Sequence, residues 1–174
     1  MAIKIDAVVV AHPDDESLWC GGLIARYKPD VICCTVPMRD PERAIKFFNA
    51  VRVLGGYPVL IPFLESPANE PLQHMDFLDL SRYKHVVTHG ADGEYGHLHH
   101  KQVHEYVKAH TECKLWTFGG EIIQTLSEEE REQKQKALEC YNHCSPSDGG
   151  EPKWVALLAR YKINMEQETY NAER

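Results

Sequence analysis

Hydrophobic and polar positions are arranged in blocks along the chain, and these blocks predict strands and helices in turn. Short apolar runs are typical of strands buried on both faces, and they occur at residues 3–10, 31–36, 59–61, 85–88 and 114–118. Apolar residues at the three-to-four spacing of helices follow at about 17–27, 41–54, 97–110 and 127–142. This alternation predicts an α/β fold, a Rossmann-like doubly wound and mostly parallel sheet with helices on both faces.

The remaining segments have weaker patterns. Residues 64–73 and 145–152 are rich in turn-forming and polar types and predict loops, with a short helical turn expected at 77–80. Residues 154–161 are apolar and fit a strand or a helix. The polar tail from about residue 165 is expected to fray. No repeat or linker interrupts the pattern, so we expect one domain spanning residues 1–174.

Composition narrows the range of partners and compartments. The 174 residues are 43% hydrophobic and carry a net charge of −7, which disfavours nucleic acid or an anionic membrane as the main partner. No apolar run is long enough to span a bilayer, and the N-terminus lacks a secretory pattern. The six cysteines include no C-x-x-C pair. We therefore expect a cytoplasmic protein with reduced thiols.

A cluster of acidic side chains and one imidazole directly follows the first predicted strand. Residues 11–16 read Ala-His-Pro-Asp-Asp-Glu, so His12, Asp14 and Asp15 lie where the strand gives way to a helix. Successive carboxylates repel one another, and a divalent metal would remove that penalty. The alternative is a helix N-cap, in which an aspartate accepts from free backbone N–H groups.

A second polar cluster, residues 89–100, follows the fourth predicted strand and contains four histidines. Loops after parallel strands emerge at one edge of a sheet, so the two clusters can meet there. His12, Asp15 and His100 would then form a site of two histidines and one carboxylate, a composition that suits catalytic zinc and non-haem iron. A solvent-facing run of histidines is the alternative interpretation.

The two clusters together resemble the motifs of the PIG-L/LmbE family of zinc-dependent N-deacetylases. Residues 11–16 are similar to its signature, and residues 93–100, Gly-Glu-Tyr-Gly-His-Leu-His-His, resemble its second motif, G-x-Y-G-H-P-D-H. Residues 43–55 and 134–145 resemble two further family helices, so the resemblance covers roughly residues 3–145.

The resemblance implies a role for each matching residue. His12, Asp15 and His100 would bind Zn²⁺, and Asp14 would be the general base for the water that attacks an amide carbonyl. His97 and Tyr95 would stabilise the developing oxyanion. From its place in the helix, Arg43 is a candidate for binding a substrate hydroxyl or phosphate. The implied reaction removes an N-acetyl group from an N-acetylglucosamine-type amino sugar or glycoconjugate.

The sequence departs from the family pattern at four positions. Leu98 and His99 replace the usual Pro and Asp, so the second motif lacks an acidic partner at that point. Lys46 stands in place of Glu, and Pro146 stands in place of Gln. None of these positions is an implied ligand or base, and the departures bear on the substrate and the rate.

Several alternatives stay open at this point. The chain could be a non-catalytic sugar-binding module of the same family, or a deacylase for a non-sugar amide. A magnesium-binding receiver domain would need an aspartate after the third strand, and residues 59–64 offer none. Iron-dependent oxygenases with a similar ligand set usually have a β-barrel rather than this alternation. The expected partner is a small amino sugar, and the sequence leaves room for a homo-oligomer.

Overall fold

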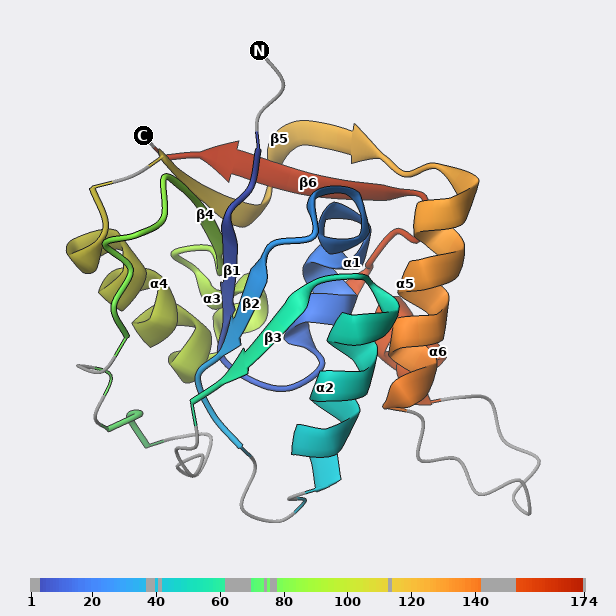
Figure 1. Ribbon diagram of the computed structural model, residues 1–174, viewed down its shortest axis with the longest axis horizontal. Helices are drawn as coiled ribbons and strands as arrows, with labels where there is room; N and C mark the ends of the chain where they lie inside the picture. Colours follow the sequence, from blue (N-terminus) through green and yellow to red (C-terminus); the bar gives the residue numbers. More distant parts are fainter. Residues whose placement is uncertain are drawn as a thin grey trace.

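The computed structural model describes residues 4–36, 40, 42–61, 70–73, 75, 78–112, 114–141 and 153–173. Within these residues, six strands form one sheet in the order β3-β2-β1-β4-β5-β6. They are β1 (Ala7–Val10), β2 (Asp30–Cys33), β3 (Tyr57–Leu60), β4 (His85–Thr88), β5 (Lys114–Thr125) and β6 (Gln167–Ala172). Strands β1 to β5 pair in parallel, and β6 runs antiparallel to β5. The predicted α/β fold with a mostly parallel sheet is confirmed (Figure 1).

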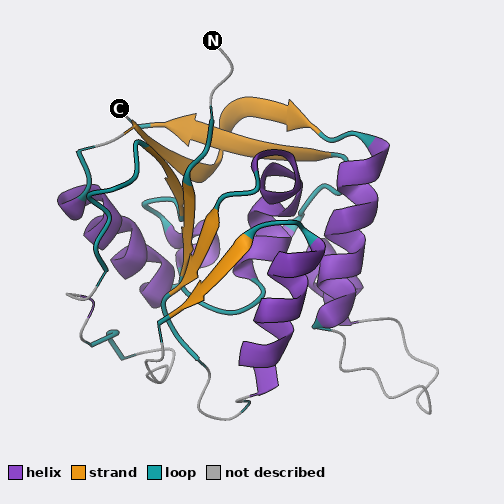
Figure 2. Ribbon diagram, viewed as in Figure 1, coloured by secondary structure: helices purple, strands orange, loops and turns teal. Residues whose placement is uncertain are grey.

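Helices cover both faces of the sheet (Figure 2). The helices α1 (Asp15–Tyr27), α2 (Glu42–Val53) and α5 (Glu128–Cys140) lie on one face, and α4 (Leu98–His110) lies on the other. The short α3 (Gly93–Gly96) precedes α4, and α6 (Lys153–Tyr161) precedes β6. Helix α5 begins with the capping box of Ser127 and Glu130, in which each side chain accepts from the other residue's backbone N–H.

Strand β1 is apolar throughout because both of its faces are covered. Val8 and Val10 pack into the core beneath α1 and α2, whereas Ala7 and Val9 pack into the core beneath α4. The strand order reverses between β1 and β4, since β2 and β3 lie on one side of β1 and β4 and β5 lie on the other. In open α/β sheets ligands bind at the carboxyl ends of the strands on either side of such a reversal.

Helix α1 is interrupted at Cys20, whose φ of −143° and ψ of 26° are not helical. Just after the break, the backbone N–H groups of Gly22 and Leu23 donate to the carboxylate of Glu168 in β6, each at 2.8 Å. Lys134 of α5 donates to the same carboxylate at 2.7 Å, and the two charged side chains are fully buried or nearly so. This ion pair therefore connects α1, α5 and the last strand.

The structure differs from the sequence expectations mainly in the C-terminal part. The tail expected to fray forms β6, whose Tyr170 and Glu168 side chains are buried. The ambiguous segment 154–161 belongs to α6, and β5 continues past 118 to Thr125 after an irregularity between Phe118 and Ile122. The expected loop 145–152, with Pro146, and residues 64–69, 76 and 77 lie outside the described residues.

Among the described helices, none combines the length and apolarity needed to cross a membrane.

Candidate metal centre

The loop between β1 and α1 is held in a strained shape that aims its carboxylates in different directions. Asp14 has a φ of 111°, a left-handed conformation that is unfavourable for a residue with a Cβ. Its backbone N–H donates to Glu16 at 3.0 Å, and the buried Glu16 also accepts from the hydroxyl groups of Ser17 and Tyr141. Asp15 accepts from the backbone N–H of His12 at 2.9 Å. Strain of this kind is concentrated at functional sites in proteins.

The loop after β4 is the second half of the site. Three of its residues have positive φ, namely Gly93 at 69°, Glu94 at 58° and Gly96 at 88°. Helix α4 then begins with His97 as its N-cap, whose ring Nδ1 accepts from the backbone N–H of His99 at 3.2 Å. The cap directs His97 toward the loop after β1, and His100 follows one turn later on α4.

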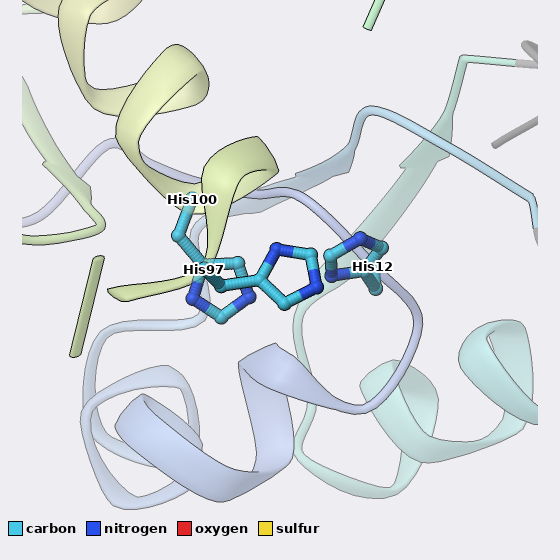
Figure 3. A group of neighbouring side chains, drawn as sticks. All are labelled: His12, His97 and His100. Carbon is cyan, nitrogen blue, oxygen red and sulfur yellow. The ribbon is translucent and has the colours of Figure 1, made fainter. Parts of the chain in front are cut away.

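The two loops meet around one carboxylate oxygen. Oδ2 of Asp15 lies 3.2 Å from Nδ1 of His12 and 3.3 Å from Nε2 of His100. It also lies 3.6 Å from Nε2 of His89, and all four side chains are buried. Figure 3 shows the rings of His12, His97 and His100 close to one another. Two overlapping groups of donor atoms lie close enough to hold a metal ion, His12 with His97 and His100, and Asp15 with His89 and His100.

Hydrogen bonds distinguish the histidines in these two groups. Nε2 of His89 accepts from the backbone N–H of Ala11 at 3.0 Å, and Nδ1 of His89 donates to Glu94 at 2.8 Å, so both nitrogens of His89 are used. His100 donates from Nδ1 to Glu94, but its buried Nε2 has no hydrogen-bond partner among the described residues. A buried nitrogen of this kind beside a carboxylate is suited to a cation.

His12 is oriented by a relay of hydrogen bonds from the opposite side of the site. Nε2 of His99 lies 2.9 Å from the carbonyl oxygen of Glu70, which can only accept, so we assign the His99 proton to Nε2. Nδ1 of the neutral His99 ring then accepts from Nε2 of His12 at 2.9 Å. This arrangement presents the lone pair of His12 Nδ1 to Asp15, which is the orientation a metal ligand requires.

The charges at the centre are strongly coupled. Burial opposes ionisation of Asp15, but the charge of the neighbouring His100 holds its pKa well below the usual value. Burial also opposes the charged form of His100, but the carboxylates of Asp15 and Glu94 raise the pKa of His100 to about 10. A site that stabilises a positive charge between His100 and Asp15 fits a divalent cation held by His12, Asp15 and His100.

Hydrogen bonding to the backbone also determines the tautomer of His97. Its Nδ1 accepts from the α4 backbone, so in the neutral ring Nε2 carries the proton. Burial and the nearby rings of His12 and His100 lower the pKa of His97 to about 4, which keeps the ring neutral near pH 7. The ring packs edge-on to His12 with 4.8 Å between centroids.

A cavity of about 160 Å³ opens beside the centre. Its walls combine the polar groups of the two loops with side chains from α1, α2 and α6, and they include His12, Asp14, Asp15, Leu18, Trp19, Arg43, Tyr95, His97, Leu157 and Tyr161. Tyr161 of α6 stacks on Tyr95 with 4.4 Å between ring centroids. Burial raises the pKa of Asp14 to about 6, although the neighbouring Arg43 lowers it. The cavity therefore brings a carboxylate, an imidazole and aromatic rings together within one small space.

The structure brings the sequence-predicted site residues to one place. His12, Asp15 and His100 converge, while Asp14, His97, Tyr95 and Arg43 line the adjoining cavity. Sequence reasoning assigned no role to Glu94 or Tyr161. Glu94 lies inside the second motif, at a position that the motif leaves unspecified, and Tyr161 lies in a segment without any motif. Lys46, which departs from the family pattern, lies 3.9 Å from Asp40.

No family model matches the chain. A curated deacetylase from Actinosynnema mirum, which acts on 1D-myo-inositol 2-acetamido-2-deoxy-alpha-D-glucopyranoside, is 44% identical over 61 residues. The match covers 30% of this chain and only 22% of that relative. The chain is thus similar to a short part of a sugar deacetylase.

Two solved structures share the fold. The 4-carboxy-2-hydroxymuconate hydratase GalB from Pseudomonas putida KT2440 superposes with a TM-score of 0.70 at 13% identity, covering 99% of this chain and 97% of its own. A deacetylase of teicoplanin biosynthesis superposes with a TM-score of 0.59 at 15% identity, covering 78% of this chain and 83% of its own. One α/β fold thus serves both a hydratase and a deacetylase, so the activity has to be inferred from the residues of the site rather than from the fold.

Proposed function

We propose that the protein is a zinc-dependent hydrolase that removes the acetyl group from an N-acetylglucosamine-type amino sugar or glycoconjugate. The observation that carries the proposal is the convergence of His12, Asp15 and His100 beside a cavity that also contains Asp14 and His97. The partial similarity to a sugar deacetylase supports the same substrate class. His12, Asp15 and His100 would hold the metal, which lowers the pKa of water and polarises a carbonyl when bound.

Asp14 is the proposed general base. It lies next to Asp15 in the chain and lines the cavity, where its carboxylate accepts from Arg43 at 2.6 Å, and both groups of donor atoms that could hold a metal ion form without it. In amide hydrolysis water adds to the carbonyl carbon, the C–N bond breaks, and acetate and a free amine are released. Asp14 accepts the proton of the attacking water and passes it to the departing nitrogen.

His97 and Tyr95 are proposed to stabilise the oxyanion. His97 lines the cavity, and its neutral imidazole, with the proton on Nε2, can donate to an oxygen that gains negative charge. Tyr95 supplies a hydroxyl from the same loop, and its side chain is 46% exposed. Arg43, which contacts Asp14 in the cavity wall, remains the candidate for binding a substrate hydroxyl or phosphate.

The proposal is tested with zinc-loaded protein and a panel of N-acetylated compounds. The panel contains N-acetylglucosamine, its glycosides and N-acetyl amino acids, and release of amine and acetate is measured together with metal content. Amine release from the sugars, lost on chelation and restored by Zn²⁺, is expected. Release from the amino acids alone would replace the sugar substrate with a non-sugar amide. Sugar binding without release would identify a non-catalytic module.

A further inference from the structure

Glu94 adopts an unfavourable backbone conformation within α3. Its φ of 58° and ψ of −52° are rare for a residue with a side chain, and glycines with positive φ lie on either side at Gly93 and Gly96. A glycine would meet this backbone requirement without strain. The glutamate side chain must therefore contribute something that offsets the strain.

The carboxylate of Glu94 makes three hydrogen bonds in the interior. Oε1 accepts from the backbone N–H of Gly90 at 2.7 Å, which fixes the turn after β4. Oε2 accepts from Nδ1 of His89 at 2.8 Å and from Nδ1 of His100 at 2.5 Å. The shared oxygen forces both imidazoles to carry a proton on Nδ1.

His89 completes the support of His100. The two rings stack with 3.9 Å between centroids and 24° between planes. His89 is itself immobilised, because its Nε2 accepts from the backbone N–H of Ala11 and the edge of its ring meets Phe118. His100 is thus fixed on its Nδ1 side by a carboxylate and on its face by a ring that cannot turn.

We propose that Glu94 is a positioning residue that holds His100 with Nε2 directed at the metal and thereby sets the affinity of the site. This inference rests on the metal-dependent function proposed above. A carboxylate hydrogen-bonded to a ligating histidine fixes the tautomer and increases the basicity of the ligand. His12 has a different support, since a neutral His99 occupies the corresponding position. Of the two proposed histidine ligands, His100 therefore donates to a carboxylate, and His12 donates to a neutral imidazole.

The test is the zinc affinity of Glu94→Gln, measured by competition with a chromogenic chelator. Glutamine keeps the size of the side chain, but its amide cannot accept from Gly90 and from both imidazoles at once. The dissociation constant is expected to rise by roughly 10–100-fold, and the absorption spectrum of the cobalt-substituted site is expected to change. Glu105→Gln, at an exposed position of α4, is the matched control and should bind zinc as the wild type does.

Wild-type zinc affinity and an unchanged cobalt spectrum in Glu94→Gln would overturn the inference. If that variant does not fold, ¹H–¹⁵N spectra of the histidine rings in the zinc-loaded wild type decide instead. A proton on Nδ1 of His100 is expected there, and a proton on Nε2 would refute the assignment. These measurements use no substrate, so failure of amine release with the expected loss of affinity would reject the deacetylase and leave the role of Glu94 standing.

Discussion

Asp14 and Arg43 form an ion pair in which Oδ2 and Nη2 are 2.6 Å apart. Arg43 belongs to α2, and its guanidinium also donates to the carbonyl oxygen of Pro13 in the same loop. The guanidinium of Arg43 thus lies against the strained turn. It stabilises the charged form of the Asp14 carboxylate, which burial alone would favour in its neutral form. The proposed base and the candidate substrate-binding residue are therefore one unit.

Replacing Asp14 with Asn should reduce kcat by roughly 10²–10⁴-fold, because the amide cannot take the proton of the attacking water. The metal content should stay the same, since both groups of described residues that could hold a metal ion form without Asp14. Steady-state kinetics with metal analysis of the same preparation check both statements. Loss of metal in this variant would show that base and ligand have been confused.

Replacing His100 with Ala should abolish tight zinc binding, because it removes the buried Nε2 that faces Asp15. Metal content after dialysis measures the effect, and Tyr95→Phe serves as a control that should retain zinc. Stoichiometric zinc in the His100 variant would contradict the proposed ligand set.

Replacing Lys134 with Met should lower the free energy of unfolding by about 3–5 kcal/mol, because Glu168 would be left as an uncompensated buried charge. Urea denaturation measures this difference. Lys136→Ala, which removes an exposed lysine of the same helix, should change stability by no more than about 0.5 kcal/mol. Equal effects of the two substitutions would show that the buried pair has no special role.

Cys34 should react slowly with iodoacetamide while the protein is folded. Burial raises the pKa of its thiol to about 12, so at a pH of about 8 the reactive thiolate is scarce. Mass spectrometry of labelled peptides, with and without denaturant, should show modification of this residue only after unfolding. Rapid labelling of Cys34 in the native protein would mean that the segment after β2 opens more readily than the burial of Cys34 indicates.

The sequence predicts the fold best where a strand is buried on both faces, because every position of such a strand is apolar. The apolar run of β1 cannot alternate, since Val8 faces one helical layer and Val9 the other. That run, followed directly by His12 and Asp15, located the carboxyl edge of a central strand. The approach of the loop after β4 then followed from parallel topology alone.

The last strand could not be predicted for a physical reason. Side-chain burial alternates along β6, where Glu168 and Tyr170 are buried and the residues next to them are more exposed. The inward glutamate looks like a surface charge, because its partners Lys134, Gly22 and Leu23 are far away in sequence. A charge satisfied only by tertiary contacts is indistinguishable in sequence from a solvated one.

The role of Glu94 was hidden by a similar difficulty. The motif leaves its position unspecified, and only the fold shows that its carboxylate lies between two imidazoles. The apolar segment 154–161 fits a strand or a helix, but nothing in it indicates that Tyr161 lies at the site, because its ring contacts Tyr95 from a distant part of the chain.

The carboxylate of Glu168 that closes the break in α1 has a consequence for the order of assembly during synthesis. Helix α1 carries Asp15 at its first position. The acceptor for the backbone N–H groups of Gly22 and Leu23 in this helix is Glu168, more than 140 residues further along the chain. During synthesis these two amides cannot reach their acceptor until β6 has been made. The loop and helix that carry Asp15 should therefore reach their final structure only after β6 has docked.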